Sequence, residues 1–495
     1  MKKLEAVIGL EIHVQLSTQS KMFCGCPRNY FNEPPNTKVC PVCLGMPGML
    51  PVINKKAVEL TILTGLALES KINHLSIFAR KNYHYPDLVK GYQISQFEEP
   101  LCDGGMVTFL LGMNTINVQL ERIHLEEDTA RLIHNNIIYK DGSLMDVNRS
   151  GVPLMEIVSK PDIYSADAAV GYLKKIRQIV RYIGVSEADM EKGSFRCDAN
   201  ISIREKGDST LGNKVEVKNM NSFKSVHKAI ETEIERQTVL FYAGDTIVQE
   251  TRGFIDGKGI TVSQRSKEQA QDYRYFPEPD LPPLLISKDA INELKNTLVE
   301  LPNQKSNRFQ NEYNLNIEES EFLVTTQQTA NNFEISLTLA CKLIDNPDIE
   351  VLAKNIANWY MGDIAKELNQ ISLAAELQNS KVTPENISEL IYMIQVKQIT
   401  VSTAKSVLEK MFSSGKNPKL IVKTEGLGQV NDSVFILELI ERILTNNQKA
   451  VNDYLNGKET VIGFLVGQVM KETKGRIDAN EAAKLLIKKI SENAK

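Results

Sequence analysis

The segment VIGLEIHVQLSTQSKMFCGCPRNYFNEPPNTKVCPVC, residues 7–43, joins a strand pattern to a cluster of cysteines. Over residues 7–16, apolar and polar side chains alternate strictly, which is typical of a half-buried β-strand. One face carries Ile8, Leu10, Ile12, Val14 and Leu16, and the other carries Glu11, His13 and Gln15. The pattern predicts a sheet that packs on one face and forms the floor of a polar cleft on the other.

Four of the seven cysteines follow this strand as two pairs, Cys24-x-Cys26 and Cys40-x-x-Cys43. Close pairs joined by a short loop match the way thiolates surround a tetrahedral zinc ion. Since four thiolates close the coordination shell, the predicted zinc knob is structural rather than catalytic. Ordinary buried thiols are one alternative, and a disulfide is a second, which the short Cys24–Cys26 spacing disfavours.

The composition predicts a globular protein of the cytoplasm. A chain of 495 residues has room for about two to four domains, and 42% hydrophobic with 24% charged residues is ordinary for such proteins. No uncharged apolar stretch reaches about 18 residues, so we expect no membrane span. Glu5, Glu11 and His13 interrupt the N-terminal apolar run, which excludes a signal peptide of the usual kind.

The charge is distributed unevenly along the chain. A net charge of −4 argues against a general nucleic-acid binder, but residues 401–495 hold fifteen Lys and Arg against eleven Asp and Glu. A basic end on an acidic body fits a protein that binds a phosphate backbone at one end and a metal ion elsewhere. Solvated Lys-rich helix faces are the alternative.

Strand patterns dominate the chain up to about residue 287. Among them are residues 195–204 and 214–218, whose polar faces are again rich in acidic and basic groups. Two helices are expected in this region, at 165–183 and 222–242, and each begins at a serine that can cap it.

The pattern becomes helical from residue 288 to the end. The stretch YFPEPDLPPLL (275–285) has four prolines and resists both helix and central strand, so the first domain is predicted to end at residue 287. Amphipathic segments follow, with Thr383 and Asn480 as expected N-caps. The predicted fold class is therefore α+β, a β-rich first domain followed by all-α domains.

More ligand-type side chains lie in HLEED (124–128) and at Glu156 within VPLMEIVSKPD. Both faces of the second segment are apolar, so Glu156 should be buried, and a buried carboxylate needs a cation. Arg149 is the simpler candidate for that cation.

The alternative is a divalent metal ion shared by several of these groups. Glu156 would bind it together with His13 and Glu127, and with Glu11 or Glu126 beside them. Mixed carboxylate and imidazole ligands suit magnesium, manganese or calcium better than a closed zinc site.

Several catalytic signatures are missing from the sequence. GKGITVS (257–263) lacks the glycine spacing and the Lys-Ser/Thr pair of a phosphate-binding loop, and neither a G-x-S-x-G elbow nor the kinase signature set occurs. No cysteine stands in a glutaminase context and no Ser/Lys amidase pattern is present. We therefore do not expect this chain to release ammonia by itself.

Seven motifs, taken together, resemble one family. They are VIGLEIHVQL (7–16), KNYHYPDLVKGYQISQ (81–96), IHLEEDTAR (123–131), DVNRSGVPLMEIVSKPD (146–162), SFRCDANIS (194–202), VEVKNMNSF (215–223) and DYRYFPEPDLPP (272–283). In this order they resemble the B subunit of the aspartyl/glutamyl-tRNA amidotransferase. The resemblance covers the first region densely and continues to GFLVGQVMKETKGRIDA near the C-terminus.

The resemblance implies a domain layout and a reaction. A cradle domain (1–287) with the zinc knob would be followed by a helical domain (288–412) and a tRNA-binding tail domain (413–495). The enzyme would be a heterotrimer, a ligase that converts misacylated Glu-tRNA(Gln) or Asp-tRNA(Asn) to Gln-tRNA(Gln) or Asn-tRNA(Asn). Its A subunit, the amidase, would release ammonia from glutamine, and its small C subunit would tie the pair together. The cradle would phosphorylate the side-chain carboxylate with ATP and Mg²⁺, then admit ammonia.

The resemblance also implies roles for individual residues. His13, Glu127 and Glu156 would bind Mg²⁺, with Glu11 and Glu126 as further catalytic groups. The cleft for ATP and the aminoacyl end would be lined by Arg149, Arg196, Asp198, Asn200, Lys218 and Asn219. The tRNA contacts of the tail would come from Lys471, Lys474 and Arg476. A salt-linked sheet face and ordinary basic helix ends are the respective alternatives.

Two other classes of function remain open at this point. One is a non-catalytic tRNA-binding scaffold of the same complex, with every chemical step in the partner amidase. The other is an independent metal-dependent phosphohydrolase or nuclease, which would hydrolyse phosphate esters without tRNA or partner.

Overall fold

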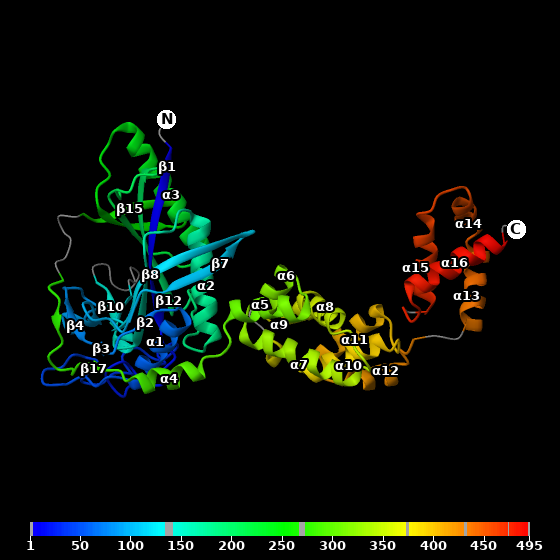
Figure 1. Ribbon diagram of the computed structural model, residues 1–495, viewed down its shortest axis with the longest axis horizontal. Coiled ribbons are helices and arrows are strands. Elements are labelled where there is room, and N and C mark those ends of the chain that lie inside the picture. Colours follow the sequence, from blue (N-terminus) through cyan, green and yellow to red (C-terminus); the bar gives the residue numbers. More distant parts are fainter. Residues whose placement is uncertain are drawn as a thin grey trace. The chain divides into compact units, whose positions relative to one another are not determined.

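A computed structural model describes residues 3–133, 142–266, 273–372, 376–429, 433–473 and 475–493 (Figure 1). The chain divides into two compact units, Met1–Leu301 and Pro302–Lys495. The first is built around a sheet and the second is helical, which confirms the order of regions predicted from the sequence. None of the helices within these ranges is both long and apolar enough to cross a membrane.

A ten-stranded sheet forms the centre of the first unit. Its order is β15-β14-β13-β12-β1-β11-β8-β6-β2, and β7 pairs with β8 outside that path. The strands are β1 (Leu4–Gln15), β2 (Lys71–Ile72), β6 (Cys102–Asp103), β7 (Met106–Leu111), β8 (Asn114–Glu127), β11 (Pro153–Ser159), β12 (Phe195–Glu205), β13 (Val215–Lys218), β14 (Glu250–Ile255) and β15 (Ile260–Ser266). The alternating stretch quoted above is therefore β1, which lies between β11 and β12 near the middle of the sheet.

Helices cover the apolar face of this sheet. Side chains of α1 (Lys55–Ala67), α2 (Ala166–Tyr182) and α3 (Phe223–Ala243) share one core with the apolar residues of β1. Figure 1 shows α2 and α3 running beside the sheet. Ser165 caps α2 and Ser222 caps α3, so both predicted helix starts are confirmed. Because the helices fill the apolar face, only the polar face is left to line a cleft.

Three smaller sheets also lie in the described part of the first unit. They are β4 (Phe78–Asn82) with β5 (Tyr92–Gln96) and β16 (Phe276–Pro277), β3 (Leu75–Ser76) with β17 (Leu284–Leu285), and β9 (Arg131–Ile133) with β10 (Leu144–Asp146). The proline-rich stretch thus contributes two-residue strands at sheet edges, where the missing amide hydrogen of proline is tolerated.

The first unit ends at Leu301 rather than at residue 287. After the proline-rich stretch the chain forms α4 (Lys288–Thr297), and its Ile291 and Leu294 pack against the core of the first unit. The prolines therefore separate elements within the unit instead of ending it.

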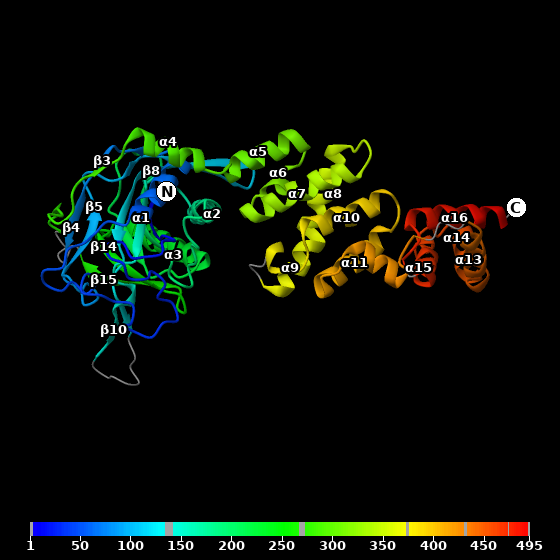
Figure 2. The ribbon, with the colours of Figure 1, turned by 90° about the horizontal axis from the view of Figure 1, so that it is seen from below.

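The described residues of the second unit form two hydrophobic cores. The first gathers α5 (Pro302–Tyr313), α6 (Ile317–Leu323), α7 (Gln327–Leu343), α8 (Ile349–Trp359), the π-helical turn η3 (Tyr360–Ile364), α9 (Ala365–Ile371), α10 (Pro384–Gln395), α11 (Val401–Ser414) and α12 (Pro418–Glu425). The second gathers α13 (Ser433–Asn446), α14 (Gln448–Leu455), α15 (Val461–Thr473) and α16 (Ala479–Asn493) (Figure 2). Since Ile421 belongs to the first of these cores, the change of core lies beyond α12, later than the boundary at 413 expected from the sequence.

Two helix caps in this unit were predicted, and one is wrong. Thr383 caps α10 as expected. At α16 the Asp478 carboxylate accepts the backbone amides of Asn480 and Glu481, so Asn480 lies inside the helix. Asp and Asn are about equally good caps, and the sequence alone did not separate these neighbours.

Candidate functional site

A cleft of about 770 Å³ lies over the polar face of the sheet. Its floor comes from the alternating strands: Glu11 and His13 of β1, Glu156 of β11, and Asp198 and Asn200 of β12. The remaining lining includes aromatic rings and a lysine, namely Lys81, Tyr83, Tyr85, Phe97, Tyr273 and Tyr275. The predicted polar cleft is therefore present, with acidic groups on one side and aromatic rings on the other.

A row of three residues crosses the floor of this cleft. The antiparallel register sets His13 of β1 opposite Glu156 of β11, and Glu156 opposite His124 of β8. The Glu156 carboxylate lies 3.5 Å from His13 Nε2 and 3.3 Å from His124 Nε2. Directly opposed residues of an antiparallel pair put their side chains on the same face, so the register alone brings these groups together.

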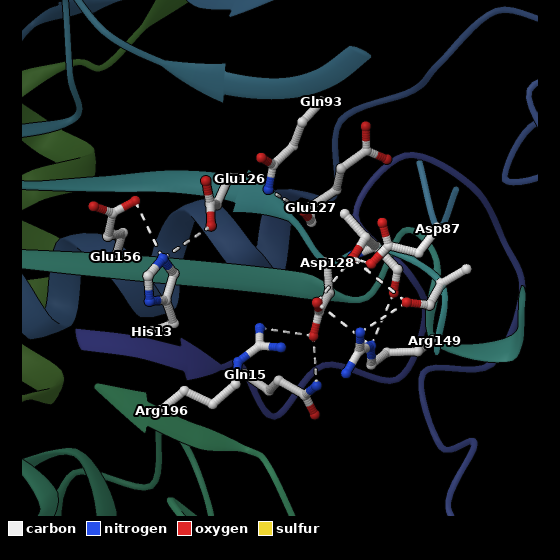
Figure 3. Close-up of polar contacts among 12 residues, drawn as sticks. His13, Gln15, Asp87, Gln93, Glu126, Glu127, Asp128, Arg149, Glu156 and Arg196 are labelled. Carbon is white, nitrogen blue, oxygen red and sulfur yellow. Dashed lines mark hydrogen bonds and ion pairs between the residues drawn. The ribbon is translucent and has the colours of Figure 1, made fainter. Parts of the chain in front are cut away.

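Glu126 joins this row from β8. It stands two residues beyond His124 and so points to the same face, and its carboxylate lies 3.7 Å from His13 Nε2. Figure 3 shows the Glu126 and Glu156 carboxylates directed at the His13 ring from two sides. One donor atom from each of His13, Glu126 and Glu156 lies within 4.8 Å of the others, a spacing that suits a divalent cation.

In this set, two buried carboxyl groups stand beside one imidazole, and their charges interact. Burial alone would raise the pKa of Glu156, but the imidazoles of His124 and His13 hold it well below its ordinary value. Burial, and then the charge of Glu156, raise the pKa of Glu126. Burial would lower the pKa of His13, but Glu156 raises it to about 9. Glu156 is therefore the charged anchor of the set, and a cation added there would favour ionisation of Glu126 as well.

Glu127, which was predicted as a ligand beside His13 and Glu156, points to the opposite face of β8. It forms an ion pair with Lys90 and accepts a hydrogen bond of 3.1 Å from the backbone amide of Ile94. There it lines a second, smaller pocket beside Cys43. Successive residues of a strand face opposite sides, so of the two glutamates only Glu126 shares the face of His13. In the predicted ligand set of His13, Glu127 and Glu156, Glu126 therefore takes the place of Glu127.

Arg149 and Arg196 both bind Asp128 and neither lines the cleft floor. Asp128 is only 3% exposed, and its carboxylate also accepts a hydrogen bond of 2.8 Å from Gln15 Nε2 (Figure 3). Arg149 donates to the backbone oxygens of Thr129 and Ala130 as well. The interpretation of Arg149 as the cation for Glu156 is therefore wrong, and His13 and His124 take that place.

His124 was missed as a partner of Glu156, although the sequence held a signal for it. In HLEED, residues 124, 126 and 128 share one strand face, and this is the face with the polar partners. A strict reading of that alternation would have separated His124, Glu126 and Asp128 from Leu125 and Glu127.

A second acidic group lies further along the floor, toward β13. Glu11, Asp198 and Glu216 have donor atoms within 4.8 Å of one another. Lys218 bridges Asp198 at 2.6 Å and Glu216 at 2.9 Å, and Asn200 donates to Glu11 at 2.9 Å. This part of the floor is thus a sheet face linked by salt bridges, which was the alternative to a lining for ATP and the aminoacyl end. Asn219, also predicted for the cleft, is exposed just beyond β13 and does not line it.

The four cysteines meet in the loops after β1. The Sγ atoms of Cys24, Cys26, Cys40 and Cys43 lie within 4.8 Å of one another. The Lys21 side chain, which is fully buried, places Nζ 3.5 Å from Cys43 Sγ and pairs with no carboxylate among the described residues. A buried ammonium needs a negative partner, and thiolates are the groups beside it.

Of the three basic residues predicted to contact tRNA, the structure describes two. Lys471 is exposed in the last turn of α15. Arg476 donates to the backbone oxygens of Thr473 and Gly426, so its guanidinium is engaged with the chain itself. Lys474 lies outside the described residues.

Comparison with known proteins covers nearly the whole chain. The GatB/GatE catalytic domain family matches residues 6–292, and the GatB domain family matches residues 347–490. The B subunit of the aspartyl/glutamyl-tRNA(Asn/Gln) amidotransferase of Dehalococcoides mccartyi is 49% identical over 493 residues, which is 99% of this chain and 100% of the relative. Proteins of the same name from Persephonella marina and Thermodesulfovibrio yellowstonii are both 48% identical, over 98% and 99% of this chain and 99% of each relative.

The buried Asp128 network gives a stability prediction. At pH 7, Asp128→Asn should lower the free energy of unfolding by about 2–4 kcal/mol, because two arginines would then face a neutral group. The arginines hold the pKa of Asp128, which burial alone would raise, below its ordinary value. This stabilisation is therefore complete above the unfolded pKa of about 3.9 and is lost as the pH falls through the folded pKa.

Urea unfolding followed by circular dichroism, with EDTA present, measures the effect at several pH values. The exposed Glu98 is the matched control, and Glu98→Gln should change the free energy by less than about 0.5 kcal/mol. A difference between Asp128→Asn and the unmodified protein that stays constant down to pH 3 would contradict the prediction.

Proposed function

The chain belongs to the GatB family, the B subunits of aspartyl/glutamyl-tRNA(Asn/Gln) amidotransferases, and from this premise we propose that its sheet cleft activates and amidates a misacylated amino acid. Such a protein is part of a glutamine-hydrolysing ligase that acts in a complex with other subunits. The proposed substrates are Glu-tRNA(Gln) and Asp-tRNA(Asn), and the products are Gln-tRNA(Gln) and Asn-tRNA(Asn). The convergence of His13, Glu126 and Glu156 in the cleft carries this proposal.

The reaction explains why the cleft needs both acids and cations. A side-chain carboxylate resists attack by ammonia, because its oxygen is a poor leaving group, whereas a phosphorylated carboxylate releases phosphate. ATP would supply the phosphoryl group. Transfer of a phosphoryl group depends mainly on positioning and on neutralising the phosphate charges. Lys81 and Lys218 both line the cleft, where their ammonium groups can orient anionic oxygens.

Mg²⁺ is the proposed metal of the cleft, held by His13, Glu126 and Glu156. Carboxylate-rich sets with a free position for phosphate oxygens are characteristic of this ion, which neutralises phosphate charge when bound. Glu11 stands two residues before His13 on the same strand face, and burial and then Glu156 raise its pKa. Glu11 is therefore proposed to support the substrate side of the cleft rather than to complete the metal shell.

The cysteine quartet is proposed to bind Zn²⁺ as a structural knob. Four thiolates with a single zinc ion carry two negative charges, and the buried Lys21 ammonium offsets one of them. Cys43, the thiol closest to Lys21, also accepts a hydrogen bond from the backbone amide of Cys40. The ion would hold together loops that have few apolar contacts of their own.

The proposal requires partners, because the chain carries no pattern for releasing ammonia. We propose that the A subunit, an amidase, supplies ammonia from glutamine and that the small C subunit joins the two larger chains. The tail, α13–α16, is proposed to contact tRNA through Lys471 and neighbouring basic groups. Since the substrates are aminoacyl-tRNAs, we place the protein in the cytoplasm, where these are made.

Glu156→Gln separates this proposal from a scaffold role. In the reconstituted complex, amide formation on charged tRNA should fall by at least about 100-fold, because the charged anchor of the site is lost. Glutamine hydrolysis and tRNA affinity should remain, since the amidase and the tail are unchanged. Formation of Gln-tRNA and release of glutamate are measured side by side.

Normal transamidation by Glu156→Gln would favour the scaffold and contradict the proposal. Hydrolysis of phosphate esters by the purified chain alone, without tRNA, would favour an independent phosphohydrolase instead.

Glu126 and Glu127 offer a matched pair for the metal assignment. Glu126→Gln should weaken Mn²⁺ binding, used as a paramagnetic probe for Mg²⁺, by more than about tenfold, because a ligand oxygen becomes an amide. Glu127→Gln, one residue away on the opposite strand face, should leave Mn²⁺ affinity unchanged. Electron paramagnetic resonance titration of free Mn²⁺ measures both, and equal losses would contradict the assignment.

Lys21 tests the zinc knob. Lys21→Gln should lower Zn²⁺ affinity by about 10- to 100-fold, the usual effect of groups that contact the ligands of a metal. The highly exposed Lys55→Gln is the control and should leave affinity unchanged. Competition with a chromophoric chelator gives the affinities, and four thiols that stay reactive when zinc is added to the unmodified protein would contradict the assignment.

A further inference from the structure

A pocket in the second unit has a lining that the chemistry of the sheet cleft does not use. It has a volume of about 400 Å³ and lies between α8, α10 and α11. Apolar side chains line one part of it, namely Trp359, Ile391 and Ile394. The polar part includes three amides, from Asn355, Asn358 and Gln395. We call this the amide pocket.

The helix that carries two of these amides changes its geometry at the pocket. Asn355 and Asn358 are three residues apart on α8, so they share one helix face. Directly after Trp359 the chain continues as the π-helical turn η3, and π turns are rare and concentrated at functional sites. Asp363 of this turn pairs with Lys405 of α11 at 3.2 Å, and both residues line the pocket.

The amide atoms of the pocket are available to a ligand. Within the described part of the chain, no side-chain hydrogen bond engages Asn355, Asn358 or Gln395. Each amide offers donors and an acceptor, so together they can match the hydrogen-bonding edge of a ring. Because Asp363 and Lys405 neutralise each other, the pocket favours an uncharged ligand over a phosphate.

An unpaired nucleobase has the properties that this lining selects. It is flat and uncharged, its faces are apolar, and its edges carry several donors and acceptors. RNA-binding proteins read unstacked loop bases with an apolar surface against the ring and amide groups at the edge. Lys354, which is exposed one residue before Asn355, stands where the phosphate of such a nucleotide could be contacted.

Resting on the proposed action on tRNA, we propose that the amide pocket takes one unpaired base from a loop of the bound tRNA. The pocket would then contribute to the choice of tRNA through base contacts, whereas lysines such as Lys354 contribute affinity through phosphates.

The test uses the full chain in its reconstituted complex and an uncharged tRNA transcript. Asn355→Ala/Asn358→Ala removes two amides while keeping residues that favour the helix. The dissociation constant should rise about tenfold or more, because base contacts of this kind discriminate by such factors. One loop base that the unmodified complex protects from a base-modifying reagent should become reactive. The slope of log affinity against log salt should not change, since no phosphate contact is removed.

Three further variants make the result decisive. Asn311→Ala alters an exposed asparagine of α5, a helix whose buried side packs into the same core, and should change none of these readouts. Gln395→Ala, at the end of α10, should reproduce a smaller loss with the same protected base. Lys354→Ala is the reference for a phosphate contact and should make the salt slope shallower by about one.

Unchanged affinity in both Asn355→Ala/Asn358→Ala and Gln395→Ala overturns the inference while leaving the proposed function intact. A loss of affinity with a shallower salt slope and no newly reactive base also overturns it, because the pocket region would then contact phosphates. An unmodified complex that binds no tRNA overturns the proposed function, and this inference with it.

Discussion

The pairing register of β1 with its neighbours is the constraint on which the rest of the first unit depends. It sets His13 opposite Glu156 and leaves the apolar residues of β1 to the helices on the other face. A slip of one residue between β1 and β11 would turn the side chains of β1 over, placing Ile12 in the cleft and His13 in the core. The hydrophobic effect that buries the apolar face thus also fixes the polar site, since a single periodicity determines both.

The charges on the polar face are arranged so that most of them are already paired. Arg149 and Arg196 are held by Asp128, and Lys218 by Asp198 and Glu216. In the row of His13, Glu126 and Glu156, two carboxyl groups stand beside the His13 imidazole and have no lysine or arginine partner among the described residues. Buried carboxyl groups that stand side by side are stabilised as anions when a cation binds, so this row is a place where a divalent ion would be stabilised.

Local patterns made β1 and the caps of α2 and α3 predictable, because these depend on residues close in sequence. The alternation in HLEED separates Glu126 from Glu127, but which of the two faces the cleft depends on the register of β8 against β11, a long-range pairing that local patterns do not determine. The domain end at Leu301 was missed for a related reason: prolines mark local breaks, whereas the packing of α4 on distant residues decides where a unit ends. The amide pocket is a further step away, since it needs three helices to be placed before its lining exists.

The two sites differ in the physical basis of their selectivity. The sheet cleft is lined by ionic groups, so charge governs what binds there, as it would govern binding of the proposed metal ion. The amide pocket has neutral hydrogen-bonding groups and one internal ion pair, so its contacts should be nearly independent of salt. A protein that handles tRNA gains from this separation, because phosphate contacts hold every tRNA alike, whereas contacts to base edges can distinguish one tRNA from another.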